Sequence, residues 1–376
     1  MRWTPRLTAR NHAMLKPDFE APRAGCLPAG ASDRITDVPG VTVGHATLSN
    51  GEVQTGVTVI KPHGHDDFLC KTPAAATVIN GFGKSVGLIQ VQELGVLETP
   101  IALTNTFSVG EVAIAQIRQA FRNHPEIGRD WPTVNPLVFE CNDGYLNDIQ
   151  ALAVSGDDYL NAYQNAATEF AQGSVGAGRG MSCFSMKGGI GSSSRIANLA
   201  NGASYTMGAL VLANFGRLPN LTVKGQALGR HIDKEGLALL SAAASAEPEK
   251  GSIIIILATN APLDVRQLQR VSKRAAAGLA RLGSVYGHGS GDISLAFTTA
   301  YQMPALADSP APAVQFVHES QIDPLFEAAA EATEQAIINA LWAATSVVGR
   351  AGHQRLAITD ALPQWRNFLK VKRKSP

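Results

Sequence analysis

The sequence predicts a layered α/β sandwich, and three observations indicate this class. Apolar strand-like segments and amphipathic helical segments are intermixed along 376 residues, without the regular strand–helix alternation of a barrel or a doubly wound sheet. The last helical segment has alanine-rich faces, which imply close packing against another layer. With 45% hydrophobic residues, the chain can bury a large core.

Apolar runs bounded by turn residues predict the strands. Residues 1–32 are irregular and proline-rich and are interpreted as a leader, and a single α/β sandwich domain is expected over 33–376. The predicted strands are 41–43, 56–60, 77–80, 137–140, 205–214 and 252–259.

Helical periodicity predicts three helices. The first covers 110–123 and has Ser108 as its cap. The second runs from its cap Asp264 to Leu282, and the third covers 323–348.

The composition excludes several classes of function. The formal net charge is +1, so no global field attracts nucleic acid or an anionic membrane, and the basic run 370–374 is interpreted as a solvated tail. The four cysteines are widely spaced and lack the pattern of a zinc site. We therefore expect no metal and no other cofactor. The chain shows neither a signal peptide nor a run of about 20 apolar residues, which predicts a cytoplasmic protein.

Two glycine-rich segments match nucleotide-binding loops only in part. Residues 83–85 read Gly-Lys-Ser, but Val78 stands where a phosphate-binding loop needs its first glycine. Residues 173–194 lack the G-x-G-x-x-G spacing and do not follow a strand. For this second segment we expect a loop that lines an active site or crosses close to another backbone.

The Gly251–Ser252 junction suggests a specific chemistry. A polar stretch, 247–250, leads into Gly-Ser at the start of an apolar strand, where a side chain is held firmly. Cleavage of this bond would give Ser252 a free α-amine with a pKa of about 7.7–8.0. Such an amine can activate the serine hydroxyl without a histidine. Taken alone, the segment fits a plain turn before a core strand better than it fits a cleavage site.

The loop 287–292 offers further catalytic groups. Its glycines flank Ser290 and Asp292 and allow both side chains to converge on a site. His288 makes a Ser-His-Asp arrangement a competing interpretation, although no G-x-S-x-G elbow accompanies it. On its own, the segment fits a functional loop and a plain turn equally well.

Together these segments resemble the family of L-aminopeptidase D-amidase/D-esterase (DmpA) and the β-peptidyl aminopeptidases. The resemblance runs from about Ile35 to Phe297 and rests on the number and the order of the matching motifs. These motifs are 35–41, 43–45, 80–84, 103–106, 109–110, 142–148, 188–195, 212–216, 251–254 and 287–292.

This resemblance implies a self-processing N-terminal-nucleophile hydrolase with an αββα four-layer sandwich. The chain is expected to cut itself between Gly251 and Ser252 into an α part, 1–251, and a β part, 252–376. The two parts stay associated and form a homo-oligomer, with a tetramer favoured. Ser252 then acts in an aminopeptidase that removes the N-terminal residue from small peptides, amino-acid amides or esters, with peptides of β-amino acids among the candidates.

The resemblance also implies roles for other side chains. Asn214 matches an oxyanion-stabilising position. Ser290 and Asp292 match a group hydrogen-bonded to the nucleophile, and some relatives carry glutamate in place of Asp292. Glu140 matches the carboxylate that holds the free amine of the substrate.

Several alternatives stay open. Relatives carry an aromatic residue near the substrate, and either Tyr145 corresponds to it or Asn142 takes its place. The same self-processing fold could serve an acyltransferase that passes the acyl group to an amine. A binding protein would retain the fold without chemistry, and a histidine-based hydrolase would use His288.

Overall fold

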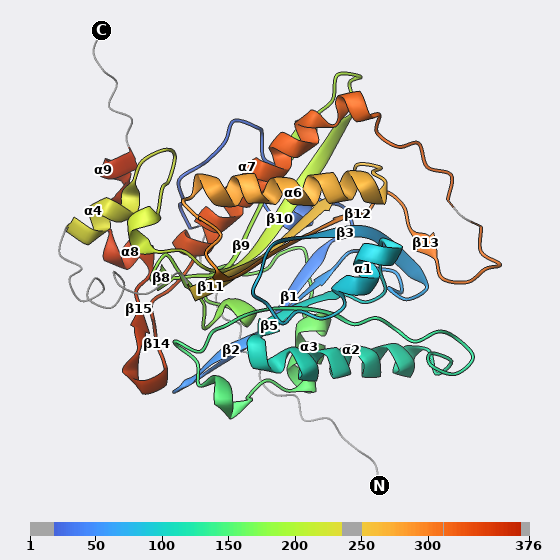
Figure 1. Ribbon diagram of the computed structural model, residues 1–376, viewed down its shortest axis with the longest axis horizontal. Coiled ribbons are helices and arrows are strands. Elements are labelled where there is room, and N and C mark those ends of the chain that lie inside the picture. The colour runs from blue at the N-terminus through green and yellow to red at the C-terminus, as the bar shows by residue number, and fades with distance from the viewer. Residues whose placement is uncertain (1–18, 235–249, 311, 370–376) are drawn as a thin grey trace.

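Two β-sheets face each other between two helical layers (Figure 1). This computed structural model describes residues 19–234, 250–310 and 312–369. The helices α6 (Val265–Arg281) and α7 (Asp323–Trp342) lie along one side of the sheets, and α2 (Val109–Asn123) and α3 (Gly156–Gln164) lie along the opposite side. The arrangement confirms the αββα sandwich.

The first sheet has four strands in the order β1-β2-β5-β6. β1 and β2 form an antiparallel hairpin, whereas β5 and β6 are parallel. A parallel pair needs a long crossover, and α2 supplies it. The strands are β1 (Thr42–Asn50), β2 (Val53–Lys61), β5 (Ile101–Asn105) and β6 (Leu137–Cys141).

The second sheet has seven strands and places β11 in its interior. β11 is parallel to β12 on one side and antiparallel to β10 on the other. Both of its faces are buried, which explains its unbroken run of isoleucines. The order is β13 (Met303–Pro304), β3 (Cys70–Gly81), β12 (Gly289–Thr298), β11 (Lys250–Thr259), β10 (Ser204–Asn214) and β9 (Gly189–Asn198), with β4 (Val96–Leu97) paired to β3.

Three hydrophobic cores join the four layers. The core between the sheets includes Phe139 from the first sheet and Ile254 from the second. Tyr159 belongs to the core under α2 and α3, and Leu268 belongs to the core under α6 and α7. The four helices are α2 (Val109–Asn123), α3 (Gly156–Gln164), α6 (Val265–Arg281) and α7 (Asp323–Trp342).

Short elements surround this frame. Two hairpins, β7 (Ser182–Cys183) with β8 (Met186–Lys187) and β14 (Val347–Val348) with β15 (Gln354–Arg355), stand outside the two main sheets. Within the described residues, the other α-helices are α1 (Leu88–Leu94), α4 (Leu228–Lys234), α8 (Ile358–Ala361) and α9 (Trp365–Leu369).

The predicted cap of the first helix is wrong. The Ser108 side chain makes no capping hydrogen bond. Instead, Asn105 Oδ1 accepts hydrogen bonds from the backbone N–H groups of Phe107 and Ser108, both at 3.0 Å. The cap therefore serves the short turn that precedes α2, one turn earlier than the sequence indicated.

The predicted end of the last helix is also wrong, because α7 stops at Trp342 and not at residue 348. Gly173 packs so closely that a Cβ there would lie 2.2 Å from the Ala343 carbonyl oxygen. The Ser174 hydroxyl then bonds to both the N–H and the carbonyl oxygen of Thr345, each at 3.0 Å. These contacts compete with the helical hydrogen bonds, and the chain continues into β14.

The glycine-rich segment 173–194 is confirmed as a place of close backbone approach. It is not a plain loop, because it contains β7, β8 and the start of β9. A Cβ on Gly191 would lie 1.9 Å from the Ala336 carbonyl oxygen. The glycine therefore lets β9 lie directly against α7.

Some predicted features lie outside the described residues. These are the first part of the leader, 1–18, the polar stretch 247–249 and the basic run 370–374. None of the helices in the described ranges combines the length and the apolar character needed to cross a membrane.

Candidate active site

Ser252 lies near the start of β11, at one end of the second sheet. It is 6% exposed and pairs with Asn214 on β10 and with Gly291 on β12. Alternate residues of a strand face the same side of a sheet. Ser252 therefore shares a face with Ile254 and Ile256, which belong to the core between the sheets. The hydroxyl is thus presented towards the first sheet, at the rim of this core.

The Ser252 hydroxyl is held against the peptide bond that precedes it. Its Oγ donates a hydrogen bond to the Gly251 carbonyl oxygen at 2.7 Å and accepts one from the Gly291 N–H at 3.2 Å. A Cβ at position 251 would lie 2.4 Å from the Asn214 carbonyl oxygen, so a larger residue would not fit there. The arrangement can support nucleophilic attack of a hydroxyl on a neighbouring carbonyl.

Asn214 is fixed in orientation beside Ser252. Its Nδ2 donates to the Asn142 carbonyl oxygen at 3.0 Å, and its Oδ1 accepts from the Ser182 N–H at 2.8 Å. The side chain is 6% exposed. A buried amide with a fixed N–H group is a suitable hydrogen-bond donor for a developing oxyanion.

Ser290 and Asp292 form a buried pair on β12. The Ser290 hydroxyl donates to Asp292 Oδ1 at 2.5 Å, and the side chains are 1% and 0% exposed. Because β12 is parallel to β11, these residues lie opposite Gly251 and Ile253, and Gly291 between them faces Ser252. The pair therefore lies next to the backbone on both sides of the serine.

His288 is not placed to act as the base. It is exposed, and its ring packs near Phe82 with 6.1 Å between the ring centroids. Within the described part of the chain, no histidine makes a hydrogen bond to the Ser252 hydroxyl. The geometry therefore disfavours the Ser-His-Asp interpretation.

Glu140 is a buried carboxylate across Gly83 from Gly291. It is 3% exposed, and it accepts hydrogen bonds from the Lys84 N–H at 2.8 Å and from the Thr106 hydroxyl. A Cβ on Gly83 would lie 3.6 Å from Glu140 Oε1 and 4.0 Å from Gly291 Cα. The missing side chain at Gly83 leaves space between the carboxylate and the strand that faces Ser252.

The structure gives Asn142 and Tyr145 different positions. Asn142 reaches the site through its backbone carbonyl, while its own Oδ1 accepts from the Gly144 N–H at 2.9 Å. The Tyr145 ring stacks on the His353 ring with centroids 4.6 Å apart, and Arg355 Cζ lies 3.5 Å from its centroid. Tyr145 therefore offers an aromatic surface beside the β14–β15 hairpin.

Burial sets the charge of three groups around the site. Burial raises the pKa of Asp143 to about 7, although the nearby Lys187 opposes the shift. Burial lowers the pKa of Lys187 well below its usual value, and its Nζ lies within hydrogen-bond distance of three backbone carbonyl oxygens, at 2.8–3.0 Å. Burial, with Glu140 and Asp292 nearby, raises the pKa of the Cys141 thiol. This cysteine therefore stays protonated and does not compete as a nucleophile.

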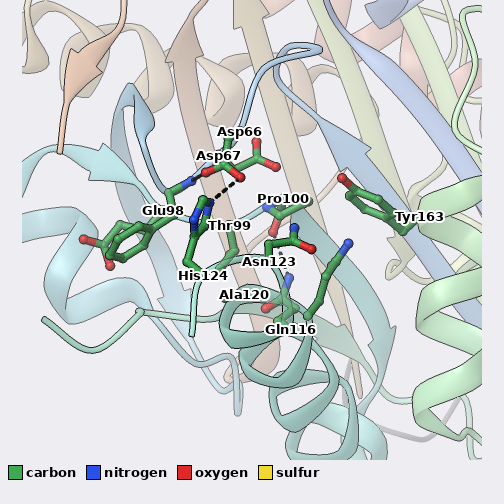
Figure 2. Close-up of a pocket in the computed structure, with 12 residues that line it drawn as sticks. Asp66, Asp67, Glu98, Thr99, Pro100, Gln116, Ala120, Asn123, His124 and Tyr163 are labelled. Carbon is green, nitrogen blue, oxygen red and sulfur yellow. Dashed lines mark hydrogen bonds and ion pairs between the residues drawn. The ribbon is translucent and has the colours of Figure 1, made fainter. Parts of the chain in front are cut away.

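A second cluster of ionisable groups lines a cavity of about 40 Å³ between the β2–β3 connection and α2 (Figure 2). There, His124 Nε2 lies 2.8 Å from Asp66 Oδ2. The cavity precedes β3, whereas Gly81 at the far end of β3 pairs with Gly291. The 12 residues of β3, at about 3.3 Å each, separate the cavity from Ser252. Across the described ranges, no group of three or more His, Cys, Asp or Glu side chains is arranged to hold a metal ion.

Three groups that hold these side chains in place were not predicted from the sequence. The Lys84 N–H and the Thr106 hydroxyl orient Glu140, and Ser182 orients Asn214. Lys84 and Thr106 belong to the motifs 80–84 and 103–106, but only the folded structure shows that they contact Glu140. Ser182 belongs to none of the matching motifs.

Comparison with known proteins identifies the family. Residues 33–355 match the family model described as peptidase family S58. The β-peptidyl aminopeptidase BapA of Sphingosinicella microcystinivorans is 39% identical over 362 aligned positions, and the match covers 90% of this chain and 88% of the relative.

Solved structures agree with this result. A Burkholderia sp. β-aminopeptidase has a TM-score of 0.80 and 39% identity, covering 91% of this chain and 96% of the other. The L-aminopeptidase D-Ala-esterase/amidase from Ochrobactrum anthropi has a TM-score of 0.82 and 32% identity, covering 93% and 98%. The latter is described as a prototype for the serine aminopeptidases and as a new variant of the Ntn hydrolase fold. The chain therefore belongs to peptidase family S58 and is a serine aminopeptidase with the Ntn hydrolase fold.

Proposed function

We propose that the protein cuts its own chain between Gly251 and Ser252 and then uses Ser252 as an N-terminal nucleophile. The observation that carries this proposal is the Ser252 hydroxyl, 2.7 Å from the carbonyl oxygen of the bond to be cut. In maturation, Oγ bonds to the Gly251 carbonyl carbon, the C–N bond breaks, and the nitrogen takes up the proton that the hydroxyl loses. Water then hydrolyses the ester, which leaves the parts 1–251 and 252–376.

Turnover uses the same hydroxyl on the substrate carbonyl. The Ser252 proton passes to its own α-amine as the acyl–enzyme bond forms, and the amine then protonates the leaving group as its bond to the carbonyl carbon breaks. Water then hydrolyses the acyl–enzyme ester, which releases the acyl group and restores the Ser252 hydroxyl. We assign Asn214 Nδ2 and the Gly291 N–H as oxyanion donors, each worth about 3–4 kcal/mol. Both already lie beside the nucleophile.

The Ser290–Asp292 pair is assigned to the new α-amine. Its position opposite Gly251 and Ile253 supports this role, because the amine appears between these two residues. The aspartate side chain is shorter than the glutamate that some relatives carry here. The 2.5 Å hydrogen bond from the Ser290 hydroxyl holds the Asp292 carboxylate in place.

Glu140 is assigned to the ammonium group of the substrate. Its burial and its position across Gly83 from Gly291 support this role. A carboxylate at this distance from the nucleophile would restrict cleavage to the first residue of a substrate. We assign Tyr145, and not Asn142, to the aromatic position beside the substrate, because Tyr145 is an aromatic residue that is 38% exposed.

The substrates are proposed to be small peptides, amino-acid amides or esters. The names of the relatives support peptides that begin with a β-amino acid. We further propose that the two parts remain associated and assemble as a homotetramer.

Two measurements test this function. Denaturing mass spectrometry should show two fragments separated after residue 251, and p-nitroanilides of L-, D- and β-homo-amino acids should be hydrolysed. Activity should fall as the pH drops below about 7.7, where the α-amine becomes protonated. An intact chain that hydrolyses these substrates would contradict the self-processing mechanism. Transfer of the acyl group to an added amine, with little hydrolysis, would instead indicate an acyltransferase.

A further inference from the structure

We infer that Arg355 binds the carboxylate of the leaving amino acid, so that the enzyme favours substrates with a free C-terminal carboxylate directly after the cut bond. The inference rests on the proposed function, because it requires the substrate amine at Glu140 and the acyl group at Ser252. It adds a binding site for the other end of a dipeptide.

The order of the strands gives the active site two sides. β12 lies on one side of β11, and β10 lies on the other. On the β12 side, Gly83 lies between Gly291 and Glu140, and Glu140 is the proposed amine site. A substrate whose amine is bound there, and whose carbonyl is at Ser252, extends its leaving group towards β10.

Arg355 lies on this second side. Asn214 on β10 accepts a hydrogen bond from the Ser182 N–H at 2.8 Å, and the Ser182 hydroxyl accepts one from Arg355 Nε at 3.2 Å. The β14–β15 hairpin, which carries Arg355, thereby reaches the end of the sandwich at which β11 begins (Figure 1). The guanidinium is thus two hydrogen bonds away from the proposed oxyanion donor.

The guanidinium is held firmly in this position. Its Cζ lies 3.5 Å from the centroid of the Tyr145 ring, which also stacks on His353 from the same hairpin. Stacking and the bond to Ser182 fix the plane of the group. An arginine that is oriented before binding loses less entropy when it forms the paired hydrogen bonds of a carboxylate complex.

The charge of Arg355 is not neutralised by a carboxylate of the described chain. Its hydrogen bonds there go to the Ser182 hydroxyl at 3.2 Å and to the Gln354 carbonyl oxygen at 3.4 Å. Burial lowers its pKa, and the only ionisable group that opposes this shift is Tyr145. A half-buried cation without a counter-ion is costly, and an anionic leaving group would supply that counter-ion.

The test compares three substrates that share one acyl residue, X, and differ only in the leaving group. The residue X is the one that wild-type protein cleaves best as a p-nitroanilide, and the other substrates are X-Gly and X-Gly amide. Arg355→Gln and Arg355→Lys are compared with Arg350→Gln. Arg350 lies in the same hairpin and donates to the Gly144 carbonyl oxygen at 3.1 Å, so it controls for changes to the hairpin.

Wild-type protein should favour X-Gly over its amide in kcat/KM. In Arg355→Gln this preference should fall about 10- to 100-fold, because a hydrogen bond between charged groups is lost. The loss should appear mainly as a higher KM for X-Gly. On the p-nitroanilide, which has no carboxylate, Arg355→Gln should lose much less activity than on X-Gly. Arg355→Lys should lose less of the preference than Arg355→Gln, and Arg350→Gln should keep it.

Two results would overturn the inference: an unchanged preference in Arg355→Gln, or an equal loss on all three substrates, which would indicate a structural role. Wild-type protein without a preference for X-Gly would overturn it as well. These outcomes differ from failure of the proposed function, in which the wild-type chain stays uncut or no p-nitroanilide is hydrolysed.

Discussion

Asn214 and Ser252 are directly opposite each other on the antiparallel strands β10 and β11. The pairing brings an oriented amide to the proposed nucleophile, although 37 residues separate the two in the chain. Both strands are buried on both faces, so neither residue can shift without disturbing the cores above and below. This rigidity makes the consequences of single substitutions specific.

Replacement of Asn214 by alanine should lower kcat about 10²- to 10³-fold and leave KM nearly unchanged, because an oxyanion donor acts in the transition state. Steady-state kinetics on a p-nitroanilide would measure this effect. Asn50→Ala, at the exposed end of β1, is the matched control and should behave as wild type. An increase confined to KM would show that Asn214 binds substrate instead.

Ser252→Ala should remain a single uncut chain and should be inactive, because the variant lacks the hydroxyl that contacts the Gly251 carbonyl. Denaturing mass spectrometry and a turnover assay on the same sample would test both effects. Circular dichroism would check that the fold is retained. Normal hydrolysis by this variant would remove Ser252 from the mechanism.

Glu140→Gln should impair the binding of substrates with a free amine. A hydrogen bond to a charged group is worth about 1.5–3 kcal/mol, so kcat/KM should fall about 10- to 100-fold, while self-cleavage continues. The measurement is kcat/KM on a p-nitroanilide, with mass spectrometry on the chain. If the variant kept wild-type kcat/KM, the amine would have to bind elsewhere.

Gly291→Ala should slow self-cleavage at least tenfold. The added Cβ would lie 2.5 Å from the Phe82 carbonyl oxygen and 3.1 Å from Ser252 Oγ, and the strand would have to move away from the hydroxyl. Gly110→Ala is the matched control, because a Cβ there meets no atom within 4 Å. The fraction of cut chain over time distinguishes the two variants, and equal rates would contradict the expectation.

Asp143→Asn should change how stability depends on pH. Burial raises the pKa of Asp143 to about 7 from 3.8, so the folded state holds a proton that the unfolded state has lost. In the wild-type protein, the contribution of this group to the free energy of unfolding is largest below about pH 4 and is lost as the pH rises through 7. The full loss is about 4 kcal/mol, at about 1.4 kcal/mol for each pH unit between 3.8 and 7, and the variant should not show it.

Urea denaturation of Asp143→Asn and wild type between pH 5 and 8 would measure this difference. The variant should gain stability relative to wild type as the pH rises. Asp130→Asn, at an exposed position, should show no such trend. A constant difference between Asp143→Asn and wild type would mean that Asp143 is already ionised at pH 5 in the folded protein.

The sequence predicted those elements whose causes are local. Asp264 caps α6 as expected, because its Oδ1 accepts from the Gln267 N–H at 2.7 Å within one turn. The end of α7 escaped prediction, because its cause is Gly173, far away in the chain. A local pattern therefore gave the start of α6, whereas a distant contact decided where α7 ended.

The candidate site shows the same division. The motifs identified Ser252 and Ser290 one by one, but the register of the parallel strands β11 and β12 is what places Gly291 opposite the serine. Glu140 receives its N–H donor from Lys84, 56 residues away. Arg355 lies outside the motifs altogether, and only the folded hairpin brings it to Ser182.

The order of strands in the second sheet has a further consequence for the cut protein. β11 and β12 would belong almost wholly to the second fragment, yet they lie between β3 and β10 of the first. Pulling the fragments apart would break two hydrogen-bonded ladders and open the cores on both faces. The uncut precursor folds from one chain, but a processed molecule that unfolds must find its other half in solution. Processing would therefore make refolding depend on the concentration of the two fragments. The mature enzyme would stay folded because it unfolds slowly.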